Sequence, residues 1–429
     1  FHLLPVFLQI ASIIIYGYSL WTFVGFNHVQ STAVVLGVII GLITTGGFVQ
    51  VIGRQASFYW NHEDFIMTKK TIDYLIKTGI FSLIFILGTI FLCNFFFHVY
   101  PFRVLLVAFT YAFLIGILLL LLAPLHTIKQ RWIISLAIFS GTAITILLKT
   151  QTNLMIYFTH WIGIIIAIVI SKAYLKLFFK NLLRKEKVNF NLEIRSAVVL
   201  YHNYKYFFYG LFLYLFIFTD RILAWSSTIN GPLPFMIYFE KNYELGMDLG
   251  ILVFLLLSGV LEYGVASFSQ FLDIGQKNTS YESPEQFNSQ LSKMYWQHVF
   301  LLLISTVVVF ILIYFLINAS WGYKAHFNES LNEISINVTI IGGIGYMFLA
   351  WAMLNTLYLF TLGQPSKPLQ AIILAFILNF MIGLIFSRFI AYEYSVVGML
   401  CGSILFMMLT LKANIDFFKK LDYYYYAAY

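Results

Sequence analysis

Apolar runs of about twenty residues, separated by short polar stretches, recur along the whole chain. A helix needs about 20 apolar residues to cross the hydrocarbon layer, because each backbone group must find its partner within the segment. The pattern therefore predicts an all-α, polytopic membrane protein with twelve spans. In the first half the predicted spans cover residues 3–25, 31–53, 78–97, 104–123, 132–148 and 154–171. In the second half they cover residues 197–219, 245–271, 299–317, 336–362, 369–387 and 395–411.

A basic stretch from Lys172 to Lys205 follows the sixth predicted span and divides the spans six and six. We interpret it as a solvated connector, with a contact surface for anionic lipid or a cytoplasmic partner as the alternative. A weak echo supports two related halves, because Ala-Ser-Phe closes both the second span, at 56–58, and the eighth, at 266–268. The predicted domains are an N-terminal six-helix bundle at 1–180, a basic cytoplasmic linker at 181–196, a C-terminal six-helix bundle at 197–413 and a cytoplasmic tail at 414–429.

The composition excludes a water-soluble fold. Hydrophobic residues make up 61% of the 429 residues and charged residues only 10%, whereas soluble chains carry about 25% charged residues. The net charge of +8 does not indicate nucleic-acid binding, because the basic residues lie in short stretches between apolar runs. Of the 26 Lys and Arg residues, only these fall outside in the twelve-span topology: Arg103, Lys149, Arg221, Lys241, Lys324 and Arg388. This bias predicts that both termini lie in the cytoplasm.

Motifs for catalysis or cofactor binding are weak in this sequence. It has no phosphate-binding G-x-x-x-x-G-K-[ST] loop, and neither its nine histidines nor its two cysteines have metal-ligand spacing. His160-Trp161 could serve an acyltransferase, but a packed or interfacial pair is the simpler interpretation. The first outer loop, residues 26–30, lacks the acidic residues expected of a lipid-sugar glycosyltransferase. We therefore predict no enzymatic activity, no catalytic residues, no metal and no cofactor, with a membrane-embedded transferase as a minor alternative.

Charged side chains inside the predicted spans are the most informative positions, because charge in lipid is expensive and usually faces a cavity. Glu262 lies well inside the eighth span, Asp220-Arg221 ends the seventh, and Asp248 enters the eighth. Each could be a structural ion pair or helix-end pair. Each could equally contact a substrate or a coupling ion.

Three segments carry a resemblance to a known family. They are TGGFVQVIGRQASFYWNHED at residues 45–64, TDRILAW at 219–225 and FEKNYELGMDLG at 239–250. They resemble the Pel exopolysaccharide transporters, the PelG family, within the multidrug/oligosaccharidyl-lipid/polysaccharide (MOP) flippase superfamily. The resemblance runs over nearly the whole chain, and Glu262 stands where that family carries a glutamate. The chain departs from the family by lacking its amphipathic leader and by having Arg221 where Lys is usual.

The resemblance implies a MATE-like architecture of two six-helix bundles around a central cavity. It implies outward export of an amino-sugar-rich polysaccharide that can carry positive charge, in concert with a cytoplasmic glycosyltransferase and membrane scaffold subunits. The substrate-pathway candidates are then Arg54, Asp220, Arg221, Asp248 and Glu262. The alternative is a flippase of the same superfamily that carries a lipid-linked oligosaccharide or another amphipathic substrate.

Overall fold

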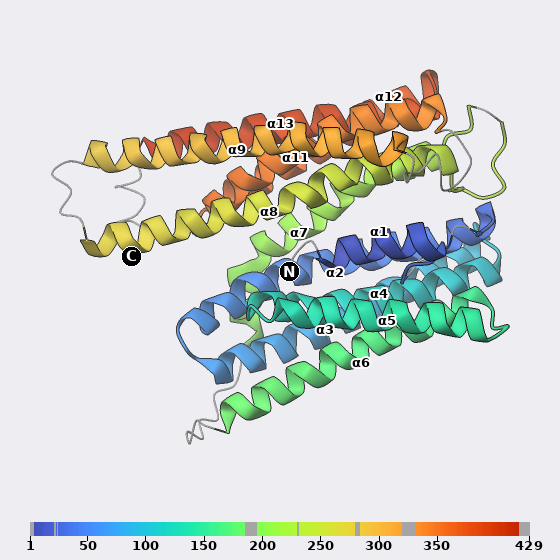
Figure 1. Cartoon of the computed structure of the whole chain (residues 1–429), viewed down its shortest axis with the longest axis horizontal. Helices are drawn as coiled ribbons and strands as arrows, with labels where there is room; N and C mark the ends of the chain where they lie inside the picture. Colours follow the sequence, from blue (N-terminus) through green and yellow to red (C-terminus); the bar gives the residue numbers. More distant parts are fainter. Residues whose placement is uncertain are drawn as a thin grey trace. The chain divides into compact units, whose positions relative to one another are not determined.

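The structure, a computed structural model, is a set of long helices without a β-strand among the residues it describes (Figure 1). Those residues are 4–20, 23, 25–184, 195–229, 231–278, 284–319 and 331–419. The helices of the first half are α1 (Leu4–Tyr16), α2 (His28–Asn61), α3 (Phe65–Phe97), α4 (Phe102–Thr127), α5 (Arg131–Gln151) and α6 (Ile156–Leu183). Those of the second half are α7 (Ser196–Trp225), α8 (Lys241–Asn278), α9 (Pro284–Asn318), α11 (Glu333–Thr361), α12 (Ser366–Phe389), the short η1 (Tyr392–Tyr394) and α13 (Ser395–Phe418).

Eleven described helices, from α2 to α13, are long and apolar enough to cross a membrane. They confirm eleven of the twelve predicted spans. The first prediction, residues 3–25 as one continuous span, is wrong. Its helix α1 has 13 residues, which makes it only about 20 Å long. It stops at Gly17, whose φ of 70° breaks the helical geometry that an uninterrupted apolar run had suggested.

The chain forms two compact units that the predicted domains only approximate. Unit 1 consists of Phe1–Leu215 and Leu233–Phe239, and unit 2 of Phe216–Pro232 and Glu240–Tyr429. Helix α7 thus contributes its first part to unit 1 and its last part to unit 2. Residues 185–194 of the predicted linker at 181–196 and residues 420–429 of the predicted tail at 414–429 lie outside the described residues, so the linker and the tail remain predictions.

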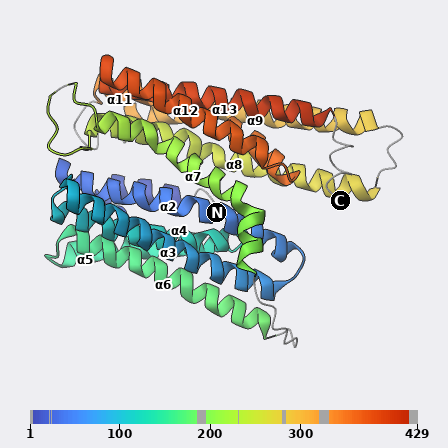
Figure 2. The same cartoon turned by 180° about the vertical axis from the view of Figure 1, so that it is seen from behind.

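Unit 1 is built around the pairing of α2 with α4, with α5 and α6 packed together beside α4. Small residues allow the close approach of α2 and α4, because a Cβ on Gly37 would overlap the Ala108 carbonyl oxygen. The first part of α7 packs on α2 in the same way, since a Cβ on Gly46 would overlap the ring of Tyr214. Seen from either side, these helices lie alongside one another (Figures 1 and 2).

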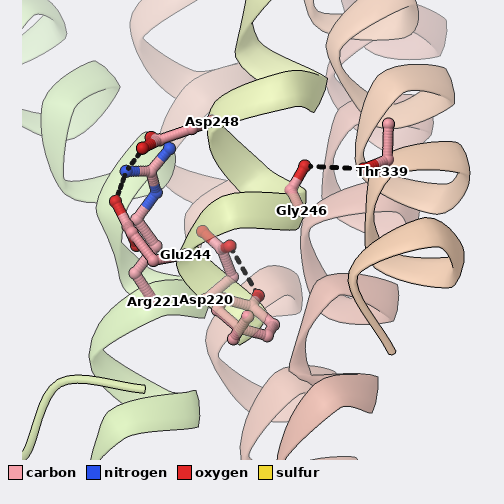
Figure 3. Close-up of polar contacts among 7 residues, drawn as sticks. Asp220, Arg221, Glu244, Gly246, Asp248 and Thr339 are labelled. Carbon is pink, nitrogen blue, oxygen red and sulfur yellow. Dashed lines mark hydrogen bonds and ion pairs between the residues drawn. The ribbon is translucent and has the colours of Figure 1, made fainter. Parts of the chain in front are cut away.

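Unit 2 is built around the pairing of α8 with α11, and α12 packs on α13. Gly246 brings α8 close to α11, because a Cβ there would stand 2.7 Å from the Ser335 carbonyl oxygen. The Thr339 hydroxyl donates a hydrogen bond to the Gly246 carbonyl at 3.2 Å (Figure 3). The Ser335 hydroxyl donates to the Asn242 carbonyl at 2.8 Å. This polar seam fixes the first turns of α8, which carry the site described next.

Candidate functional site

Charged side chains from two helices of unit 2 meet in one cluster. Asp220 and Arg221 come from the last turns of α7, and Glu244 and Asp248 come from the first turns of α8. Glu244 and Asp248 are four residues apart, so they lie one above the other on the same face of α8. All four residues fall within helices long and apolar enough to span a membrane.

Arg221 is the centre of this cluster. Its Nη1 donates to Glu244 Oε1 in an ion pair and lies 3.4 Å from Asp248 Oδ1. Its guanidinium also stands over the ring of Phe218, 5.6 Å from the centroid. Figure 3 shows the Arg221 side chain between the two carboxylates of α8. One cation therefore holds two anions from a neighbouring helix.

Asp220 has a different partner, although it is adjacent to Arg221 in sequence. The buried Tyr243 hydroxyl donates to Asp220 Oδ2 at 2.7 Å. Tyr243 directly precedes Glu244 on α8. The adjacent residues Asp220 and Arg221 of α7 therefore contact two adjacent residues of α8. The α7–α8 pair in unit 2 is thus joined by two ion pairs of Arg221 and one charge-assisted hydrogen bond.

Most of the cluster is buried, and one carboxylate is accessible. The side chains of Arg221 and Glu244 are 5% and 8% exposed, whereas that of Asp248 is 60% exposed. Several buried polar atoms have no hydrogen-bond partner among the described residues, namely Asp220 Oδ1, Arg221 Nε and Nη2, and Glu244 Oε2. Two carboxylates are paired with one guanidinium and a third carboxyl group belongs to the adjacent Asp220, so the cluster has hydrogen-bonding capacity and negative charge left over. Such a group inside membrane spans is a functional-site candidate by default.

The structure brings together three of the five sequence-predicted pathway residues: Asp220, Arg221 and Asp248. Glu262 is half-buried on the same helix α8, but it lies about 20 Å along the helix axis from Asp248. Arg54 belongs to unit 1, where its exposed guanidinium stands 5.5 Å from the ring centroid of Tyr206. Glu262 and Arg54 therefore occupy surroundings of their own.

The sequence-based prediction missed Glu244, the main partner of Arg221. It placed the start of the eighth span at residue 245, whereas α8 begins at Lys241. The missed signal was the spacing of four residues between Glu244 and Asp248, which predicts a shared helical face if the helix starts one turn earlier. Tyr243 and Tyr346 could not be predicted from the sequence. Tyr346 is buried on α11 within electrostatic range of Arg221.

A metal site finds no support in the part of the chain that the structure describes. No group of three or more His, Cys, Asp or Glu side chains there is arranged to hold a metal ion. The cluster contains a cation of its own, Arg221, which is paired with two of its carboxylates. The arrangement is suited to holding and exchanging ionic partners rather than to forming a covalent intermediate.

Comparison with solved structures identifies the fold. The chain is similar to an outward-facing multidrug resistance MATE family transporter of the MOP superfamily, with a TM-score of 0.66 and 12% identity, over 98% of this chain and 94% of that one. It is similar to a mutant MATE protein, with a TM-score of 0.64 and 14% identity, over 98% and 95% of the two chains. It is also similar to a MOP superfamily transporter from Pyrococcus furiosus, described as having a binding pocket of reverse polarity, with a TM-score of 0.64 and 13% identity, over 98% and 94%.

No protein-family model matches the sequence, and no curated protein matches it either. The likeness to solved structures, at 12–14% identity, is one of fold. The predicted fold class, an all-α polytopic membrane protein of the MOP/MATE type, is confirmed. The chain is a multi-pass membrane protein with the fold of MOP superfamily transporters.

Proposed function

We propose that this chain is a transporter, not an enzyme, that moves an amino-sugar-rich exopolysaccharide of the Pel type outward across the bacterial cytoplasmic membrane. The observation that carries the proposal is the Arg221 cluster: one guanidinium paired with two carboxylates, with a third carboxyl group on the adjacent residue, inside the spans of a MOP-type fold. The sequence resemblance to Pel exopolysaccharide transporters supports the choice of substrate.

The excess of carboxylates in the cluster favours a cationic substrate. An unmodified amino sugar carries an ammonium group near neutral pH, and charge-assisted hydrogen bonds to a carboxylate are the stronger kind. Asp248 is the accessible carboxylate, and it lies 3.4 Å from Arg221, at the long end of hydrogen-bond geometry. We infer that Asp248 receives the ammonium group, while the buried Glu244 keeps Arg221 in place. Arg54 and Glu262 remain candidates for contacts elsewhere along the path.

The location and partners of the chain belong to the same proposal. The Lys/Arg distribution supports a cytoplasmic C-terminus and a strongly basic inner face. With eleven spans from α2 to α13, a cytoplasmic N-terminus requires the segment before α2 to cross the membrane as well. A cytoplasmic glycosyltransferase would deliver the polymer there, with membrane scaffold subunits and lipids holding the export complex together. Nucleic acid has no part in this function.

The test is Asp248→Asn, which keeps the shape of the side chain and removes its charge. We expect polymer export from cells to fall by about fivefold or more, with membrane insertion and thermal stability near wild type, because exposed ion pairs contribute at most about 1 kcal/mol. Glu333→Gln is the matched control, since Glu333 is an exposed acid in the first turn of α11. Wild-type export by the Asn variant, at equal protein level, would contradict the role given to Asp248.

A flippase for a lipid-linked oligosaccharide or another amphipathic substrate is the second candidate. It is favoured by the fold shared with a multidrug resistance MATE family transporter. Proteoliposomes containing the purified chain distinguish the two. Movement of a fluorescent amphipathic cation, abolished by Asp248→Asn and unaffected by amino-sugar oligomers, would support the flippase and overturn polymer export.

A further inference from the structure

A cavity of about 470 Å³ opens at one end of unit 1. It is bounded by the last turn of α3, the turn into α4 and the start of the 233–239 segment. Its walls are aromatic, formed by Phe91, Phe95, Tyr100, Phe102 and Phe235. The Lys/Arg distribution predicts this end to be the outer one. Its volume falls within the range of small-molecule sites.

The base of this cavity is fixed by hydrogen bonds. The Asn94 side chain accepts from the Tyr100 backbone N–H at 2.8 Å and donates to its carbonyl at 3.1 Å. The Tyr100 hydroxyl donates to the Ile237 carbonyl and accepts from the Ile237 N–H, both at 3.1 Å. Burial raises the pKa of Tyr100 to about 12, so its hydroxyl stays protonated at physiological pH. The cavity is therefore preformed.

The 233–239 segment has a second attachment in unit 1. The Phe239 N–H donates to the Thr32 hydroxyl at 3.0 Å, and the ring of His28 stacks on Tyr238 with the centroids 5.9 Å apart. The ring of Phe235 packs against that of Tyr100, 5.6 Å between centroids. The Phe235 ring, which forms one wall of the cavity, is thus held by its own contact with Tyr100 and by the attachment of residues 238–239 to α2.

The chemistry of the walls is that of a carbohydrate site. Flat aromatic rings stack on the apolar faces of sugar rings, and the exposed imidazole of His98 at the cavity wall can hydrogen-bond to a hydroxyl. None of the described residues that line the cavity is Asp, Glu, Lys or Arg, in contrast to the Arg221 cluster. Residues 98–101 and 234–235 lie outside the membrane-spanning helices, which favours an occupant from water over a lipid chain.

We infer that this cavity is a binding site for an uncharged sugar ring, such as an N-acetylated hexosamine unit of the exported polymer. The inference rests on the proposed function for the identity of the polymer. It gives the two units different tasks: the Arg221 cluster binds ammonium groups, and the cavity binds neutral rings. A partly N-acetylated amino-sugar chain carries both.

The test measures binding of chitotetraose, a neutral N-acetylglucosamine tetramer, to the purified full chain in lipid nanodiscs. We expect Phe95→Ala and Phe235→Ala each to weaken binding by about three- to tenfold, the range for loss of one aromatic stacking contact. Phe97→Ala is the matched control, because Phe97 is 76% exposed on the same helix end, against 66% for Phe95, and does not line the cavity. The control should bind like wild type.

Three outcomes separate the inference from the proposed function. Weakened chitotetraose binding in both cavity variants supports the site even if Asp248→Asn leaves export intact. Equal binding by wild type and both variants, in a chain that exports polymer, overturns the site and leaves the proposed function standing. If wild type binds no chitotetraose, and both cavity variants lose binding of a spin-labelled phospholipid, the cavity is a lipid site and the inference is overturned.

Discussion

Each unit buries a polar centre within its helices, and the two centres differ in charge. In unit 1 the centre is neutral: the Tyr111 hydroxyl lies 2.9 Å from His160 Nδ1, and the ring of Phe26 contacts the imidazole edge to face. In unit 2 the centre is the Arg221 cluster, with an ion pair and an additional carboxylate. The same fold thus accommodates polar groups in its interior in two ways.

From this difference we propose a functional role for the centre of unit 2 and a structural role for the centre of unit 1. The neutral pair of unit 1 satisfies the buried polar atoms of Tyr111 and His160 Nδ1 at moderate cost, within an aromatic and aliphatic core. A buried ion pair is seldom the most stable solution for a helix interface, because apolar residues of similar size often do as well or better. We therefore expect the charges of unit 2 to be retained because they bind substrate. Substitutions in the two centres test this difference.

The largest effect should come from Arg221→Met. It removes the cation paired with Glu244 and leaves that carboxylate buried, which costs about 3–5 kcal/mol. Thermal unfolding in detergent, followed by size-exclusion chromatography, measures the loss. Arg103→Met, at an exposed position of unit 1, is the control and should unfold like wild type.

A double variant makes this prediction stricter. Arg221→Met with Glu244→Gln removes both charges, so it should recover much of the stability while transport stays lost. If the double variant is as unstable as the single one, the ion pair is not the reason for the loss and the contrast between the units weakens.

An intermediate effect is expected from Tyr243→Phe. The substitution deletes the hydroxyl that donates to Asp220 Oδ2, and a hydrogen bond to a charged group is worth about 1.5–3 kcal/mol. The melting temperature should fall clearly, by less than for Arg221→Met. Tyr392→Phe, whose hydroxyl lies 3.4 Å from Glu240 in a weaker contact, is a matched comparison and should change little.

The smallest effect belongs to His160→Phe in unit 1. The ring keeps its place in the aromatic core while the Tyr111 hydroxyl loses its partner, at a cost of about 1 kcal/mol. Export should remain near wild type, because the neutral centre has only a structural task here. A variant that is stable yet transports nothing would assign His160 to the mechanism and end the division of tasks.

The hydrophobic pattern predicted most of the fold, because the length needed to cross a bilayer leaves few alternatives for long apolar runs. It failed at residues 3–25, where Gly17 and Ser19 interrupt the helix inside a run that composition alone joins together. Close pairings such as that of Gly246 with Ser335 depend on which helices meet, and a single sequence does not contain that information.

The candidate site was predicted in part for a related reason. Asp220, Arg221 and Asp248 were recognised because charge inside a span is costly. Glu244 was missed because a helix boundary placed one turn too late put it outside the span. Its pairing with Arg221 depends on the packing of α7 against α8 in unit 2, a tertiary contact that periodicity does not reveal.

The assignment of residues 233–239 to unit 1 has a consequence for how the gene could be divided. A cut within residues 185–194 would separate the chain into six helices and the remainder, yet the first fragment would lack both Ser196–Leu215 and Leu233–Phe239. The second fragment carries these two pieces, so unit 1 could be completed only with the second fragment present, whereas unit 2 lies wholly within that fragment. The two structural units therefore do not correspond to the two halves of the sequence, and neither half can be exchanged as an independent module.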